Sequence, residues 1–317
     1  MGVSRLTAQL QAGNHMRKEY EYQGEGYYLK LQEGADGLQV TACGGRTSLV
    51  QVPEAVEGKI VTGIAKKAFL SRKHIRELIL PPTIKKIEDW AFAYCGQLEQ
   101  ITLPGGVTEM GKSVLINADA LQKINCVADV GLHQWSEDVA YLLAGAVKDL
   151  DAYYLLDLQA AGSREWFAKW DTRLLAVMKE DDNEGYLKQI LCGEEDYGST
   201  DLEAFLSGKR KKKVRLCMLR LQHSQAIGVE MRAYLSNYLQ EHTKGCEKEE
   251  TWQVLLHERN ADKESWDLFL ELGCATAENM EGLLADMGEN YPEMKAYFLR
   301  YKAEKLGYDD FFAGLEL

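Results

Sequence analysis

The cysteines of this chain show no paired spacing. Seven of them are scattered over 317 residues, without a C-x-x-C pair and with an odd total. Disulfide frameworks and thiolate zinc sites show closer or paired spacing, so the pattern argues against both and predicts reduced thiols in a cytosolic protein. The positions are Cys43, Cys95, Cys126, Cys192, Cys217, Cys246 and Cys274.

Long apolar runs are also missing. No stretch approaches the roughly 18 to 20 uninterrupted apolar residues of a membrane span, and residues 1–20 lack the apolar run of a secretory signal. We therefore predict a cytoplasmic protein that makes no membrane contact. Residues 1–20 are expected to be a disordered tail, within which Met16, followed by the charged Arg17-Lys18-Glu19, is an alternative start.

No motif for catalysis or metal binding occurs. The six histidines never form H-x-x-x-H or H-E-x-x-H, and G-x-S-x-G, the P-loop and G-x-G-x-x-G are absent. The acidic clusters at residues 180–184 and 194–196 do not fit a calcium loop, and charge runs beside helix ends are usually solvated. Their alternative role is pairing with the basic run at residues 209–213 of this or another molecule. We predict a non-enzymatic chain without cofactor or metal. The alternative is an enzyme whose site is assembled from scattered residues at a domain junction.

Excess positive charge is absent overall, since the formal net charge is -12. Nucleic acids and anionic membranes need a basic surface that displaces counterions, so binding to either is disfavoured. One basic run is the local exception and could bind nucleic acid, phosphate or an acidic partner. Its alternative role is a solvated first helical turn and the loop before it, although cations there oppose the helix dipole. The run is Lys209, Arg210, Lys211, Lys212 and Lys213.

The chain does contain one pattern three times between Val61 and Cys126. Ile64, Ile87 and Met110 are spaced by 23 residues, and so are five further sets of apolar positions. A copy this short cannot bury its own apolar side, so the copies must stack and form columns through a shared core. The columns are Val61/Ile84/Val107, Ile64/Ile87/Met110, Phe69/Phe92/Leu115, Ile75/Leu98/Leu121, Leu78/Ile101/Ile124 and Leu80/Leu103/Cys126.

The sequence V-T-x-I-x-x-x-A-F followed by L-x-x-I-x-L-P at this period resembles the BspA-like leucine-rich repeats of bacterial proteins. The resemblance covers about residues 38–127 and decays in the third copy, where Val114-Leu115 replaces Ala-Phe, as in a capping repeat. It implies repeats that serve as interaction surfaces and carry no catalytic residues. Many relatives are secreted or surface-displayed, whereas this chain shows no export signal.

The L-x-x-L-x-L spacing predicts a short strand in each copy, with core-facing and solvent-facing side chains in alternation. The solvent-facing positions then form two rows on an open face. We expect an unidentified protein partner to bind these rows and the groove between the domains. The rows are Glu77, Gln100, Lys123 and Ile79, Thr102, Asn125.

Both ends of the repeat have expected neighbours. Alternation on either side of Glu33–Gly37 predicts a β-hairpin that caps the solenoid. After Val127 only Pro292 remains among the prolines and helical periodicity takes over, with capping signals such as Thr200-Asp201-Leu202-Glu203. The expected helices span residues 136–146, 163–179, 184–191, 200–206, 210–222, 229–241, 248–259, 263–272, 277–287 and 291–306, and glycines 145, 193, 208, 245, 273 and 307 are expected to end helices.

We therefore predict an α+β chain in which a short leucine-rich-repeat solenoid, capped by an N-terminal β-hairpin, precedes an all-α domain. Short helices in series favour a repeat-like array of stacked helix pairs, as in ankyrin or HEAT proteins, and a compact irregular bundle is the alternative. The expected boundaries are 1–20 for the tail, 21–130 for the repeat domain and 131–317 for the helical domain. The predicted function is a protein-interaction module or scaffold, because stacked repeats present extended surfaces.

Overall fold

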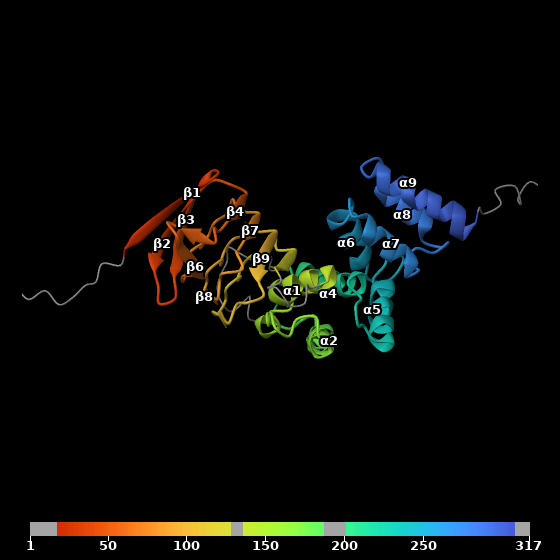
Figure 1. Ribbon diagram of the computed structural model, residues 1–317. Coiled ribbons are helices and arrows are strands. Elements are labelled where there is room, and N and C mark those ends of the chain that lie inside the picture. Colours follow the sequence, from red (N-terminus) through yellow and green to blue (C-terminus); the bar gives the residue numbers. More distant parts are fainter. Residues whose placement is uncertain (1–17, 128–135, 187–200, 308–317) are drawn as a thin grey trace, which may run out of the picture. The chain divides into compact units, whose positions relative to one another are not determined.

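A computed structural model describes residues 18–127, 136–186 and 201–307 (Figure 1). The chain divides into two compact units, the first containing residues up to 121 and 125–134, the second containing 122–124 and the residues from 135 onward. The expected tail lies outside the described residues as far as position 17, and strand β1 already begins at Glu19. Each unit is described by itself below.

Two parallel sheets form the repeat. One has the strand order β11-β9-β7-β4, and its strands β7, β9 and β11 are those predicted from L-x-x-L-x-L. The other sheet includes β6, β8 and β10, which arise from the V-T-x-I segments and were not predicted. The first set is β4 (Leu49–Gln51), β7 (Glu77–Ile79), β9 (Gln100–Pro104) and β11 (Lys123–Val127). The second set is β6 (Lys59–Ile64), β8 (Lys86–Ile87) and β10 (Glu109–Met110).

The predicted N-terminal hairpin is confirmed. Strands β2 (Tyr27–Glu33) and β3 (Leu38–Gly45) pair antiparallel, and β1 (Glu19–Gly24) adds a further antiparallel strand. Strand β3 then pairs in parallel with β6, so the hairpin continues the second sheet in the order β1-β2-β3-β6-β8-β10. The short β5 (Ala55–Val56) pairs with β6. The hairpin thus occupies the edge of β6 that an uncapped solenoid would expose.

The predicted core columns are buried in the first two copies. Phe69 and Phe92 are both 0% exposed, and their ring centroids lie 5.5 Å apart. The prediction of burial fails at two positions of the third copy, which departs from the repeat pattern, since Met110 and Cys126 are partly exposed. Loss of apolar packing is therefore confined to the last copy, where the repeat pattern also decays.

The turns between the sheets repeat in backbone conformation as well as in sequence. Positive φ angles recur every 23 residues, at 62° in Lys67, 59° in Trp90 and 51° in Ser113. The same holds at Ser71, Tyr94 and Asn117. Side-chain-bearing residues rarely adopt this conformation, and the turns are held by backbone bonds between copies, such as that from Phe92 N to Val114 O at 3.0 Å. The third copy thus keeps the turn geometry after losing Ala-Phe.

The described part of the second unit contains eight α-helices (Figure 1). The expected helix at 184–191 lies largely outside the described residues, and the repeat-like arrangement stays a prediction. The helices are α1 (Glu137–Lys148), α2 (Arg164–Lys179), α4 (Leu202–Gln222), α5 (Val229–Glu241), α6 (Glu250–Glu258), α7 (Lys263–Glu271), α8 (Met280–Met287) and α9 (Pro292–Tyr301).

Two of the expected helix stops are wrong. Helix α4 runs through Gly208 and joins two predicted helices into one of 21 residues, capped by the side chain of Asp201. Helix α1 runs through Gly145, where a Cβ atom would lie 2.4 Å from Leu219 Cδ2. A side chain at 145 would therefore require the end of the Leu219 side chain to shift, whereas Gly273, with φ at 71°, follows the end of α7 as predicted.

Candidate functional site

The two outward rows lie side by side on the parallel sheet of β4, β7 and β9. Glu77 is paired with Gln100 and Ile79 with Thr102, and all four are partly exposed. Between them Leu78 is 1% exposed, so the alternation of outward and inward side chains is as predicted. Strand β4 extends both rows by Leu49 and Gln51, which pair with Glu77 and Ile79 and were not among the predicted row positions.

Lys123 and Asn125, the predicted continuation of the rows, lie on β11 and are partly exposed. The Lys123 Nζ lies 2.6 Å from Glu137 Oε1 and 4.4 Å from the centre of the Tyr141 ring. The hydrogen bond to Glu137 raises the pKa of the Lys123 ammonium. Its charge is therefore already compensated, and binding in the expected groove between the domains stays a prediction.

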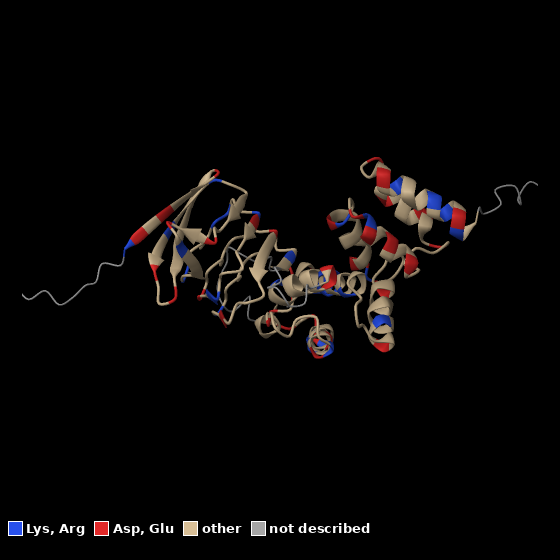
Figure 2. Ribbon diagram, viewed as in Figure 1, with Lys and Arg blue, Asp and Glu red and all other residues tan. Residues whose placement is uncertain are grey.

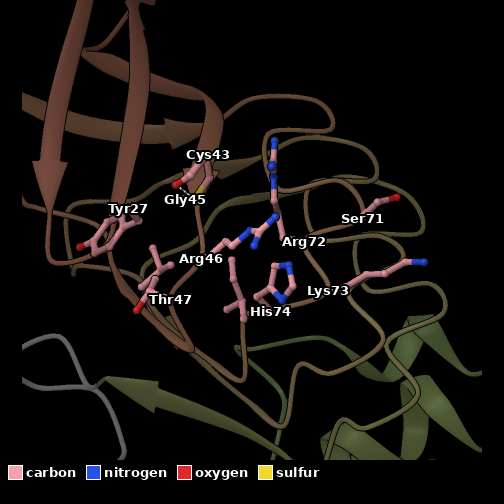
Figure 3. A pocket seen from close by; sticks show the side chains of 12 residues that line it. Tyr27, Cys43, Gly45, Arg46, Thr47, Ser71, Arg72, Lys73 and His74 are labelled. Atoms are coloured by element: carbon pink, nitrogen blue, oxygen red, sulfur yellow. Dashed lines mark hydrogen bonds between the residues drawn. The ribbon is translucent and has the colours of Figure 1, made fainter.

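A pocket of about 290 Å³ opens between the β3–β4 loop and the turn that follows Phe69 (Figure 3). Its walls carry four basic side chains and no aspartate or glutamate. In Figure 3 three of them gather at the centre of the view, and Lys73 extends away from them. We call it the cationic pocket, and its basic residues are Arg46, Arg72, Lys73 and His74.

A comparison with protein-family models agrees with this architecture. Residues 52–134 match the family described as "BspA type Leucine rich repeat region (6 copies)". This segment is a BspA-type leucine-rich repeat region. Its turns repeat about every 23 residues, and a helical C-terminal part follows it. No catalytic family is found, and no curated protein matches the chain.

Solved bacterial leucine-rich repeat proteins are similar to about a third of the chain. One from T. pallidum is 22% identical with a TM-score of 0.29, covering 32% of this chain and 52% of that one. One from Bacteroides ovatus is 23% identical with a TM-score of 0.30, covering 33% and 29%. A leucine-rich cell surface protein from Faecalibacterium prausnitzii is 19% identical with a TM-score of 0.29, covering 34% and 30%. The chain thus spans about half or less of each.

The cationic pocket of the BspA-type region was missed by sequence reasoning, which singled out only residues 209–213 as a basic run. A signal was present, since residues 58–76 contain six Lys and Arg and no Asp or Glu in a chain of net charge -12. The basic residues there are spread along the segment, so they form no run. Only the fold shows that some of them share a pocket with Arg46.

The predicted basic run lies inside helix α4, not in a first turn and the loop before it, because α4 begins at Leu202. Arg210 and Lys213 are only 5% and 7% exposed. The run therefore offers no continuous solvent-facing row of five cations. The other three, Lys209, Lys211 and Lys212, are partly exposed, and their role in anion binding stays a prediction.

The two buried cations of the run pair with carboxylates of their own unit. Arg210 Nη1 lies 2.8 Å from Glu250 Oε1, and Lys213 Nζ lies 2.8 Å from Asp182 Oδ1. Burial raises the pKa of the Asp182 carboxyl, but the hydrogen bonds and charges of Lys213 and Arg210 outweigh it and hold that pKa below its ordinary value. Asp182 belongs to the acidic cluster 180–184, so the alternative role proposed for that cluster, pairing with basic residues, is confirmed there.

A second hollow, of about 550 Å³, lies in the helical unit beside Lys244 and Asn279. Its polar groups already bond to one another. Lys244 Nζ lies 2.6 Å from Asp286 Oδ2, and Asn279 Nδ2 donates to the backbone oxygens of Lys244 and Cys274. Charges are interspersed along these helices, as Figure 2 shows. The hollow therefore offers a ligand fewer unsatisfied groups than the cationic pocket does.

Most of the described cysteines are buried, and Cys43, Cys95, Cys217, Cys246 and Cys274 carry free thiols. Burial raises the pKa of the Cys43, Cys95 and Cys274 thiols to about 11. These thiols are thus protonated and unreactive at neutral pH, including Cys43, which lines the cationic pocket. The prediction that Cys126 is buried in the core is wrong, because it is partly exposed.

Thiol labelling should separate these cysteines. At pH 8 we expect iodoacetamide to modify the exposed Cys246 at least about a hundredfold faster than Cys43 or Cys95, because only a thiolate reacts and burial also blocks access. Peptide mass spectrometry over a time course measures the rates. In urea the rates should converge, and similar rates in the native protein would contradict the burial described here.

Within the described residues, no group of three or more His, Cys, Asp or Glu side chains could hold a metal ion. None of the helices in that part of the chain combines the length and the apolar composition that a membrane crossing requires.

Proposed function

We propose that the chain is a non-catalytic binding module whose outward rows contact a protein partner. The observation that carries the proposal is the in-register pairing of Glu77 with Gln100 and Ile79 with Thr102 on a parallel sheet. Neighbouring strands lie about 4.8 Å apart, so equivalent side chains form straight columns at that spacing. Such columns present a fixed pattern to a partner at little entropic cost, because the sheet already holds them.

The chemistry of the rows suits a polar protein surface with some apolar contact. One row carries a carboxylate and an amide, at Glu77 and Gln100, and the other carries a methyl-rich and a hydroxyl side chain, at Ile79 and Thr102. Leu49, 45% exposed, adds an apolar group at the β4 end. Mixed composition of this kind is typical of non-obligate interfaces, which are about as apolar as the remaining surface.

The test is affinity capture from a lysate of the source cells, with Glu77→Arg/Thr102→Arg compared with wild type. We expect this double variant to lose capture of the partner, since two long cations on adjacent strands change both the charge and the shape of the rows. The matched control is Glu54→Arg/Thr108→Arg, which adds the same charge at exposed positions outside the rows. A partner kept by the row variant, or lost equally in the control, would contradict the proposal.

Nucleic-acid or phosphate binding through residues 209–213 is the second candidate, and it has less support because Arg210 and Lys213 are buried. Captured nucleic acid that is lost on neutralising Lys209, Lys211 and Lys212 would favour it.

We further propose that the chain acts in the cytoplasm, supported by the free thiols. Recovery of the native protein from the cell-surface fraction would contradict that location.

A further inference from the structure

We propose that the cationic pocket binds a phosphate monoester. This inference concerns a site separate from the outward rows, because no residue of the rows lines the pocket. It rests on the charge, the unsatisfied donor and the shape of the pocket.

The pocket concentrates positive charge without compensation. No ion pair within the described residues engages Arg46, Arg72, Lys73 or the His74 ring, and no acidic residue lines the walls. Arg76, by contrast, lies outside the pocket and forms an ion pair, because its Nη1 lies 2.5 Å from Glu99 Oε1. Like charges that share a pocket repel one another. A bound anion would relieve that repulsion.

An unsatisfied donor points to the same ligand. The Nε of Arg72 is buried and has no hydrogen-bond partner among the described residues. A buried N–H without an acceptor is costly, and the great majority of such groups are paired. The neighbouring Cys43 cannot supply a negative charge, because burial raises the pKa of its thiol to about 11. An acceptor-rich ligand would satisfy the guanidinium.

The walls of the pocket are rigid and leave room for more than a lone anion. The Tyr27 hydroxyl donates to Gln51 O at 2.6 Å and accepts from Gln51 N at 3.2 Å, which fixes the ring. At Gly45, with φ at 104°, a Cβ atom would lie 2.3 Å from Gly26 O, so only glycine allows the loop to pass there. Val50 and Ile75 also line the pocket, and they are 0% and 4% exposed. A volume of about 290 Å³ is at the small end of ligand pockets.

The chemistry of the donors selects a phosphate monoester. Such a group carries about -1.5 to -2 charges at neutral pH and three acceptor oxygens, which suits the two guanidinium groups of Arg46 and Arg72. Arginine forks match phosphate oxygens in pairs. A monoanion would leave more of the positive charge uncompensated.

The experiment is calorimetric titration of the full chain with phenyl phosphate at low salt. We expect one site, with affinity reduced about tenfold or more in Arg46→Gln and in Arg72→Gln, the loss of one charge-assisted contact each. Lys66→Gln, an exposed lysine of the same region outside the pocket, is the matched control and should change affinity less than about twofold. Because Arg46 is exposed, its variant tests the proposal even if Arg72→Gln folds poorly.

Benzenesulfonate, a monoanion of similar shape, should bind at least about tenfold more weakly than phenyl phosphate, since it lacks the second charge. Absence of phenyl phosphate binding at millimolar concentration, equal binding of the sulfonate, or equal losses in all three variants would each overturn the proposal. The row variant Glu77→Arg/Thr102→Arg should bind phenyl phosphate like wild type. Failure of the pocket and failure of the rows are therefore distinguishable.

The phosphate monoester could be a free metabolite or a phosphorylated side chain of a protein, and the titration separates these sources. A phosphoserine peptide that binds at least about tenfold more tightly than phenyl phosphate would identify a phosphorylated chain, because additional contacts then come from the peptide. A sugar phosphate that binds as tightly as such a peptide would identify a metabolite. The unphosphorylated peptide is the control for the phosphoserine peptide.

Discussion

Replacing Arg220 by methionine is expected to destabilise the helical unit by about 3–5 kcal/mol, the usual cost of removing one partner of a buried ion pair. Arg220 is 0% exposed and lies in α4. Its Nε lies 2.6 Å from Asp171 Oδ1 and its Nη2 lies 3.2 Å from Asp171 Oδ2, so the pair is bidentate between α4 and α2. Methionine would fill much of the space but leave the Asp171 carboxylate without its cation.

Two further features make Arg220 hard to replace. Its Nη1 and Nη2 donate to the backbone oxygens of His223 and Gln225, which hold the chain as it leaves α4. Its guanidinium carbon lies 5.6 Å from the centre of the Phe167 ring and 5.9 Å from that of Trp170. Lysine supplies neither the planar fork nor the stacking. We therefore expect Arg220→Lys to be destabilising as well.

Urea unfolding followed by circular dichroism at 222 nm measures this effect, because that signal reports the helices. The control is Arg232→Met on α5, an exposed arginine, where we expect a change within about 0.5 kcal/mol. A loss below about 1 kcal/mol in Arg220→Met would show that Asp171 finds other partners or water. The network would then be a consequence of packing, and its contribution to stability would be small.

The Arg220 network also shows why the helical unit was only partly predictable. Helical periodicity placed most helices within a few residues, because an apolar stripe is a local signal. The partner Asp171, however, lies 49 residues away, and no local pattern joins the two. Gly145 was misjudged for the same reason: in isolation a glycine predicts a helix end, whereas here it allows Leu219 to pack closely.

The solenoid was more predictable because equivalent residues of its repeat copies, 23 positions apart, pair with one another on neighbouring strands. The pairing of Glu77 with Gln100 could therefore be predicted from the repeat alone. The second sheet was missed because β8 and β10 contain only two residues each, too few to show alternation. The cationic pocket was missed because Arg46 belongs to a loop outside the repeat, and only folding brings it beside Arg72.

The largest effect in the solenoid is expected from Phe92→Ala, which should destabilise it by about 3–5 kcal/mol, as for other buried aromatics. Phe92 is 0% exposed and lies in the middle copy, between Phe69 and Leu115 of its column. Its backbone N donates to Val114 O, and Phe69 N donates to Ala91 O at 2.8 Å, so the backbone ladder joins the same three copies. A cavity there would weaken the packing of both neighbouring copies.

Hydrogen exchange of amides in residues 61–121, followed by mass spectrometry, measures this loss within the solenoid itself. The control is Tyr94→Asn, which introduces at an exposed, left-handed position the residue that the third copy carries as Asn117, and it should change stability by less than about 0.5 kcal/mol. Leu115→Ala, in the terminal copy, should cost less than Phe92→Ala because it has a repeat neighbour on one side only. Stability in a stacked array is a sum of copies and the interfaces between them. Equal losses of stability at Phe92 and Leu115 would therefore mean that Leu115, like Phe92, is stabilised by packing on both sides.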